Sequence, residues 1–202
     1  MYLDFQRTFA HFPIISMQEI TKSFPKFDKK ALVNWQSKGY IQRIRNGYYV
    51  FSNSLKSEEF LFYTANKIYA PSYISFENAL AYYGIIPEGV FLQTSATTLK
   101  TNYFKTSVGD FSYKKIKNAL YFGYHLVQKN ELTYKIATKE KAILDILYLS
   151  ENIKSLEDFK ALRWNKEILK TLNFKRIQEY LSIIQSKTLE KRVQLLIAYI
   201  HA

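Results

Sequence analysis

The sequence predicts a mixed α+β protein, with three short helices and a β-hairpin at the N-terminus, a larger mixed region and a helical C-terminus. Apolar residues recur at helical spacing near both ends of the chain, and runs typical of strands gather between residues 90 and 137. An Asn-Gly pair at positions 46 and 47 separates two further strand-like runs. At 202 residues the chain is long enough for one or two compact domains.

The first two helices are predicted from apolar spacing and from a capping signal. Residues 1–12 have the pattern of an amphipathic helix, with a predicted buried set of Leu3, Phe5, Phe9 and Phe12. Ser16 and Glu19 have the spacing of a capping box, so we expect the second helix to start there. It should stop before Pro25, because a residue that precedes proline disfavours the helical region.

A third helix and a hairpin follow. We predict the helix over residues 28–38, with Asp28 as its N-cap and Gly39 just beyond its end. Asn46-Gly47 then predicts a two-residue type I′ turn, which needs positive φ at both positions.

The expected register of the hairpin decides where its arginines point. A two-residue turn places Arg45 opposite Tyr48 and Arg43 opposite Val50. Side chains alternate along a strand, so both arginines should share one face. The other face should contain Ile44, Tyr49 and Phe51.

The polar stretch 52–57 has the composition of a linker, and we therefore predict two domains, residues 1–57 and 58–202. The first has nine Lys or Arg and three Asp or Glu, and the second has twenty and fourteen, so each has a net charge of +6. The charge density is thus more than twice as high in the shorter N-terminal piece.

The second region is predicted to be α+β. Helical patterns lie at 58–69, 75–83, 139–150 and 189–200. Strand-like runs lie at 90–94, 110–113, 121–124 and 134–136.

Three helices followed by a hairpin is the order of a winged helix-turn-helix, in which the third helix lies in the major groove of DNA. Lysine contacts phosphates or guanine, and asparagine makes a paired contact to adenine. The predicted DNA-binding residues are Lys29, Lys30, Asn34 and Lys38 on the third helix and Arg43, Arg45 and Asn46 on the wing. The simpler alternative for each of them is a solvated charge or an ordinary hairpin.

Composition narrows the partners and the chemistry. The formal net charge of +12 favours a polyanion, either nucleic acid or an anionic membrane surface. The chain has no cysteine, which excludes disulfides and thiolate sites. His11, His125 and His201 lack ligand spacing, and no Gly-rich phosphate loop occurs, so we expect no metal, no cofactor and no catalytic residues.

The N-terminus lacks the apolar core of a signal peptide and no stretch reaches the length of a membrane helix, so we expect a cytoplasmic protein without a membrane partner.

We interpret three polar features of the second region as structural rather than functional. Glu77 fits a first-turn acid that the helix dipole favours. Lys141 and Asp145 fit an i,i+4 helix pair worth about 0.2–0.5 kcal/mol. We interpret Lys100, Lys105, Lys114, Lys115 and Lys117 as a solvated face, although an extended DNA footprint or an RNA contact stays open.

Three blocks of the chain resemble the abortive-infection AbiEi-type antitoxins. The first runs from Ile15-Ser16-Met17 through Leu32 to Gly39-Tyr40-Ile41-Gln42-Arg43-Ile44-Arg45-Asn46-Gly47-Tyr48-Tyr49. The second is residues 71–88, PSYISFENALAYYGIIPE, and the third is residues 139–145, KEKAILD. The match spans roughly residues 1–150, and the middle block is its most specific part.

The resemblance implies a bacterial antitoxin of a type IV toxin–antitoxin system that acts in phage defence. In that family the winged helix represses its own operon by binding repeats in the promoter, and the second domain counters a nucleotidyltransferase-like toxin. Direct contact with the toxin is not required, because antagonism in this class can act without a stable complex. Lys29, Lys30, Asn34, Arg43 and Arg45 take the DNA-facing roles by position.

Two other classes of function stay open. One is a nucleic-acid-processing enzyme with a DNA-binding head, which metal-dependent cleavage of DNA or RNA would favour. The other is a ligand-sensing repressor, which thermal stabilisation by a small metabolite would favour.

Overall fold

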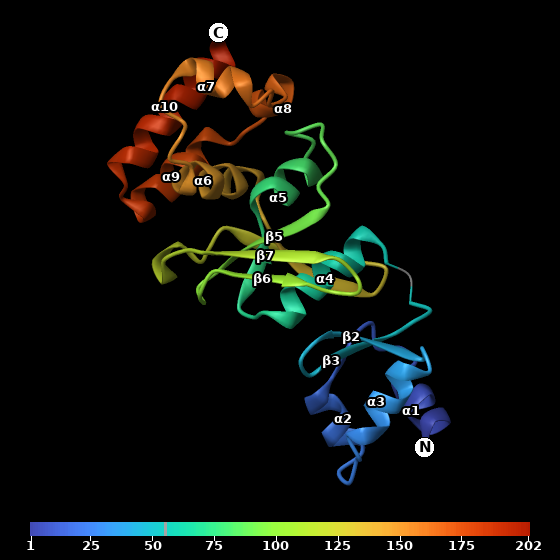
Figure 1. Ribbon diagram of the computed structural model, residues 1–202. Coiled ribbons are helices and arrows are strands. Elements are labelled where there is room, and N and C mark those ends of the chain that lie inside the picture. Colours follow the sequence, from blue (N-terminus) through green and yellow to red (C-terminus); the bar gives the residue numbers. More distant parts are fainter. Residues whose placement is uncertain (55) are drawn as a thin grey trace.

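The protein has a mixed α+β fold, as the sequence predicts. A computed structural model describes residues 1–54 and 56–202, which form ten α-helices, one 3₁₀-helix, a three-stranded sheet and a six-stranded sheet. The N-terminal elements lie at one end, the six-stranded sheet lies in the middle, and the C-terminal helices lie at the other end (Figure 1).

The N-terminal part contains three helices and a small antiparallel sheet. Its elements in chain order are α1 (Tyr2–Phe9), β1 (Ile15–Ser16), α2 (Met17–Ser23), α3 (Lys30–Ser37), β2 (Ile41–Arg45) and β3 (Tyr48–Phe51). The strand order is β1-β3-β2, so the last strand lies in the centre.

Local signals place these helices close to where the sequence predicts them. The capping box is present, because Ser16 accepts from the Glu19 backbone and Glu19 accepts from the Ser16 backbone, and α2 ends before Pro25 as expected. Asp28 accepts from the Lys30 N–H at 2.9 Å, but α3 begins only at Lys30, with Lys29 at the N-cap position.

The core of this part is aromatic. Phe5 and Phe9 are buried as predicted, whereas Leu3 and Phe12 are exposed by 63% and 39%, so their place in the predicted buried set is wrong. The α1 helix ends at Phe9, which leaves Phe12 beyond its last turn. Trp35 of α3 packs against Phe5, with 4.7 Å between the ring centres.

The hairpin forms, but its turn and register differ from the prediction. Only Gly47 of the two turn residues has a positive φ, so the turn is not type I′. Arg45 pairs with Tyr48 as predicted, whereas Arg43 pairs with Tyr49 and not with Val50. An irregularity between Arg43 and Arg45 shifts the register and breaks the alternation on which the predicted faces depended.

The six-stranded sheet has the order β6-β7-β5-β4-β9-β8. Its strands are β4 (Ser72–Ile74), β5 (Leu92–Thr97), β6 (Asn102–Lys105), β7 (Asp110–Lys115), β8 (Tyr124–Lys129) and β9 (Leu132–Ala137). The β4–β9 and β5–β7 pairs are parallel and the other pairs are antiparallel. The predicted run at 121–124 lies mostly before β8, and β4 and β6 were not predicted.

Helices complete the larger part. They are α4 (Glu58–Ile68), α5 (Phe76–Tyr82), the 3₁₀-helix η1 (Asn118–Leu120), α6 (Lys139–Leu149), α7 (Leu156–Ala161), α8 (Lys166–Lys170), α9 (Phe174–Ile184) and α10 (Lys187–His201). Among the described residues, no helix is long and apolar enough to cross a membrane.

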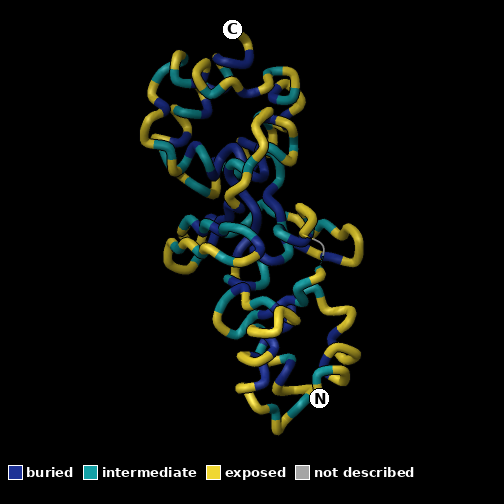
Figure 2. Tube along the Cα trace, turned by 45° about the vertical axis from the view of Figure 1, so that its right-hand side comes forward, coloured by how far each residue is buried: buried dark blue, intermediate teal, exposed yellow. Residues whose placement is uncertain are grey.

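Buried residues occur along the whole chain, from the N-terminal part to the C-terminal helices (Figure 2). Their hydrophobic side chains form two cores. The smaller lies within residues 5–49, and the larger extends over the rest of the chain. Ile14, Ile44 and Val50 belong to the larger core, although they lie in the N-terminal part. Ile44 and Tyr49 are therefore buried in different cores, which contradicts the shared face predicted for them. The predicted linker 52–57 forms no helix or strand in its described residues, and Leu55 lies outside them.

Candidate nucleic-acid interface

The α3 helix presents two different faces. Ala31, Leu32 and Trp35 are buried against the small core. The opposite face exposes Lys30, Val33, Asn34 and Ser37, which follow the i, i+3, i+4, i+7 spacing of one helical face. The buried face fixes the helix, so the exposed face has a defined orientation.

Four of the seven predicted DNA-binding residues lie on or beside α3. Lys29 is its N-cap residue, Lys38 is its C-cap residue, and Lys30 and Asn34 lie between them; all four are exposed. Among the residues that the structure describes, the three lysines form no ion pair and the Asn34 side chain makes no hydrogen bond. Three positive charges and a free amide therefore face solvent together.

Arg45 does not lie on an open wing, which corrects the sequence prediction. Its guanidinium donates a hydrogen bond to the Ile68 carbonyl at the end of α4. It also lies over the rings of Tyr69 and Phe104, at 5.3 and 4.3 Å from their centres. The shifted register turns this side chain toward the larger part of the protein.

The rest of the hairpin is short and close to its neighbours. Arg43 is exposed, and its carbonyl accepts from the Ser107 hydroxyl at 3.4 Å. Asn46 is exposed at the turn, and the next carbonyl, that of Gly47, accepts from the Met17 N–H at 2.7 Å. The hairpin therefore leaves one arginine available to solvent instead of the predicted pair.

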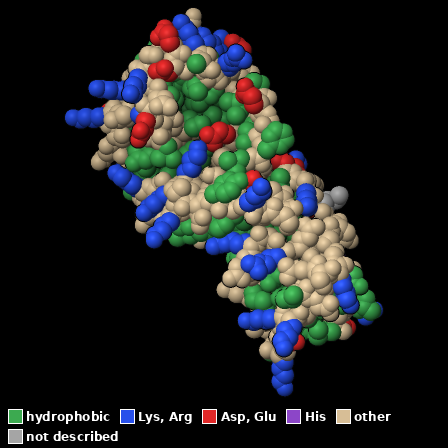
Figure 3. Space-filling model, viewed as in Figure 1, with side chains coloured by type: hydrophobic (Ala, Val, Ile, Leu, Met, Phe, Trp, Pro, Cys, Tyr) green, Lys and Arg blue, Asp and Glu red, His purple; other side chains and the backbone are tan. Residues whose placement is uncertain are grey.

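Two exposed lysines near α3 were not among the residues predicted to bind DNA. Lys22 lies in the last turn of α2, and Lys26 lies in the turn between α2 and α3; both are exposed. The signal available in the sequence was their position, because the turn of a helix-turn-helix lies beside the third helix. On the face shown in Figure 3, Lys and Arg side chains project from the N-terminal part, while most Asp and Glu side chains lie over the helical end.

An ion pair holds α2 to the larger part of the protein. Lys67 of α4 lies 3.0 Å from the Glu19 carboxylate, which also accepts from the Ser16 N–H at 2.6 Å. Burial pushes the pKa of Glu19 upward, but the hydrogen bonds from Ser16 and Lys67 outweigh it and hold that pKa below its ordinary value. Glu19, which belongs to the capping box of α2, therefore also fixes the orientation of this helix relative to α4.

The larger part contains a buried polar network, which corrects the view of Lys141 and Asp145 as an ordinary helix pair. Lys141 is fully buried and pairs with Asp145. Asp145 also accepts from the hydroxyls of Tyr73 at 2.8 Å and Ser75 at 2.7 Å, and Lys141 donates to Tyr73 at 2.8 Å. Burial and the neighbouring carboxylate raise the pKa of Tyr73. Gly123 leaves room for the lysine stem, since a Cβ there would lie 3.0 Å from it.

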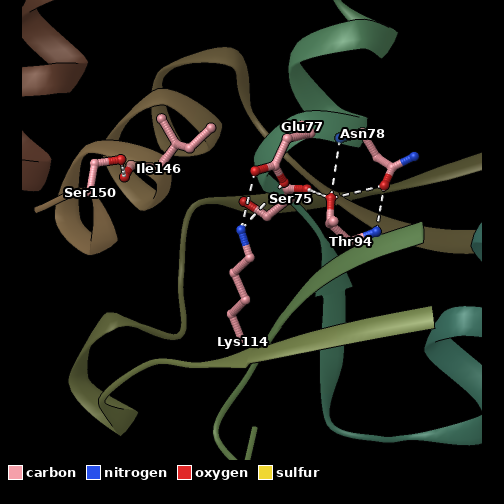
Figure 4. Close-up of polar contacts among 7 residues, drawn as sticks. All are labelled: Ser75, Glu77, Asn78, Thr94, Lys114, Ile146 and Ser150. Carbon is pink, nitrogen blue, oxygen red and sulfur yellow. Dashed lines mark hydrogen bonds and ion pairs between the residues drawn. The ribbon is translucent and has the colours of Figure 1, made fainter. Parts of the chain in front are cut away.

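A second network joins α5 to the sheet (Figure 4). The Thr94 hydroxyl donates to the Ser75 carbonyl at 2.8 Å and accepts from the Asn78 N–H at 3.2 Å. Glu77 pairs with Lys114 at 3.2 Å, so an ion pair accounts for it in addition to its place in the first turn of α5. Ser75 occupies the N-cap position of α5 but does not cap it through its side chain, which is bonded to Asp145. These groups satisfy one another and hold β4, α5, β5 and α6 together.

Comparisons with known proteins leave the family open. No family model matches the chain, and no curated protein matches it. Within the described residues, no three His, Asp or Glu side chains are grouped so that they could hold a metal ion.

Proposed function

We propose that the protein is a sequence-specific DNA-binding regulator whose N-terminal part is a winged helix-turn-helix. The observation on which this rests is the exposed face of α3, where Lys29, Lys30 and Lys38 surround Asn34 and, among the described residues, form no ion pair. The order of three helices and three strands, with β3 between β1 and β2, supports the same architecture.

The proposal assigns roles by position on α3. Lys29 and Lys38 lie at the two ends of the helix and contact phosphates, whereas Lys30 and Asn34 face the base edges. Arg43 adds a flanking phosphate contact. Arg45 is left out, because its guanidinium is already bonded within the protein.

We further propose that the protein acts as an antitoxin that represses its own operon and counters a nucleotidyltransferase-like toxin. The support is the resemblance of residues 71–88 and 139–145 to the AbiEi-type antitoxins, and one structural fact. These two blocks are far apart in the sequence, yet Tyr73 and Ser75 of the first bond directly to Asp145 of the second. They therefore belong to one packed unit. In this proposal the protein is not an enzyme. Divalent-metal-dependent cleavage of nucleic acid by the pure protein would contradict it.

The test is fluorescence anisotropy with the duplex upstream of the protein's own gene and a scrambled duplex, across a salt series. Tighter binding to the upstream duplex near physiological salt is expected, and Lys30→Ala should weaken it. Lys175→Ala removes one exposed charge from α9 and serves as the matched control. Equal binding to both duplexes, with a steep loss in salt, would show that net charge alone explains the affinity.

A further inference from the structure

Val33 is an apolar side chain on the polar face of α3. It is 68% exposed, while the helix's other apolar residues, Ala31, Leu32 and Trp35, are 8% exposed or less. An exposed valine adds nothing to the packing of the helix. Its side chain is therefore free to contact whatever that face of α3 binds.

The neighbours of Val33 are the groups proposed to face DNA. Lys30 lies one turn before it, Ser37 lies one turn after it, and Asn34 is adjacent. Helical spacing places these four side chains on one face. The Ser37 hydroxyl donates to the Asn34 carbonyl at 2.8 Å, which leaves Val33 and the Asn34 amide as the central groups of that face.

The major-groove edge of DNA offers one apolar group, the 5-methyl of thymine. Asparagine makes its paired contact with N6 and N7 of adenine. A branched, stiff valine beside a free asparagine amide therefore matches a groove floor that presents a thymine methyl next to an adenine. We infer that Val33 packs on a thymine methyl and that Asn34 contacts adenine, so that the middle of the bound site consists of A·T pairs. This inference rests on the proposed DNA-binding function.

The alternative is that another protein binds this face of α3 and packs an apolar surface against Val33. The surrounding charges disfavour it for a second copy of the chain, because the three lysines of α3 would meet the same three charges, and Asp28 is the one acid beside them on this helix. The same charges favour the phosphate-lined walls of a DNA groove.

The experiment begins with selection of the tightest duplexes from a randomised library by the full-length protein. Each thymine of the selected site is then replaced singly by uracil, which removes only the 5-methyl group. At one position or more, uracil should weaken wild-type binding about four-fold, as expected for one buried methyl group. Val33→Ala should bind the thymine duplex more weakly and should lose the response to uracil at that position.

The controls distinguish a failure of this inference from a failure of the proposed DNA-binding function. Leu3→Ala removes a similarly exposed apolar side chain from α1 and should keep the uracil response. Wild-type binding that is unchanged by every uracil, or a full uracil response in Val33→Ala, would overturn the inference while leaving DNA binding intact. Selection of no sequence over the starting library would overturn the proposed function and this inference with it. Concentration-dependent sedimentation that Val33→Ala abolishes would assign the face to self-association instead.

Discussion

The guanidinium carbon of Arg45 lies 4.3 Å from the centre of the Phe104 ring. Arg45 ends β2 in the N-terminal part, whereas Phe104 belongs to β6 at the edge of the larger sheet. The same guanidinium donates to the carbonyl of Ile68, the last residue of α4. Together with the ion pair between Lys67 and Glu19, this contact fixes the hairpin and α2 to the end of α4.

The two arginines of β2 should therefore respond differently to removal. Arg45→Ala is expected to lower the free energy of unfolding by about 1–3 kcal/mol, because it removes a half-buried hydrogen bond and the packing against two rings. Arg43→Ala should leave stability nearly unchanged and weaken DNA binding. Urea denaturation and anisotropy of both variants test this. An Arg45→Ala protein as stable as the wild type, with the larger loss of DNA affinity, would contradict it.

The buried pair in α6 gives a second prediction, about stability. Asp145→Ala should cost about 3–5 kcal/mol, because it leaves the Lys141 charge buried without its partner and removes the acceptor of Tyr73 and Ser75. The double variant Lys141→Met/Asp145→Leu should recover a large part of that loss, since no buried charge is left. Urea denaturation measures both. A loss below 1 kcal/mol for Asp145→Ala would show that the network is not needed.

The sequence predicts the elements of this fold better than their contacts. Ser16 with Glu19 and Gly39 are local signals, and each marks a helix end where the structure has one. The face of Arg45 could not be predicted in the same way, because one register shift in β2 reverses the alternation. Strand β4 has only three residues, too few for an alternating pattern to be recognised.

The burial of polar side chains, like the strand register, could not be predicted from the sequence. Lys141 and Asp145 have the spacing of a solvent-exposed helix pair, and only the packing of β4 and Gly123 against α6 shows that they are buried.

The exposed residues of α3, in contrast, could be predicted from the sequence. Lys29, Lys30, Asn34 and Lys38 were selected as exposed from the apolar positions of α3, and all four are exposed.

Acid should weaken the fold through Glu59. A hydrogen bond from Lys129 lowers the pKa of the Glu59 carboxyl to about 2, below its ordinary value of about 4.5. The pKa is lower in the folded state, so the contribution to stability is complete above about pH 5 and is lost as the pH falls toward 2. Glu59→Gln should lose less stability than the wild type over that range in thermal melts. Parallel losses in both proteins would contradict this role.

The proposed domain boundary can be tested with a fragment of residues 1–57. Ile14, Ile44 and Val50 are at most 5% exposed in the whole chain and are buried in the larger core. The fragment would expose them to water, so it should melt well below the full-length protein and bind the upstream duplex only weakly. Circular dichroism and anisotropy measure the two properties. A fragment as stable as the whole chain would show that the N-terminal part does not depend on these contacts.

Salt dependence should separate the residues of α3 that contact phosphates from those that contact bases. Neutralising one phosphate-binding side chain reduces the slope of log K against log salt by about 0.9, so Lys29→Ala and Lys38→Ala should each flatten it by about that amount and weaken binding to all sequences alike. Asn34→Ala should leave the slope unchanged and lower the discrimination between the upstream and scrambled duplexes by about 1–3 kcal/mol, because a paired contact to adenine releases no counterion. Lys175→Ala on α9 should change neither quantity. A flatter slope in Asn34→Ala, or a loss of discrimination in Lys29→Ala alone, would require the roles on α3 to be exchanged.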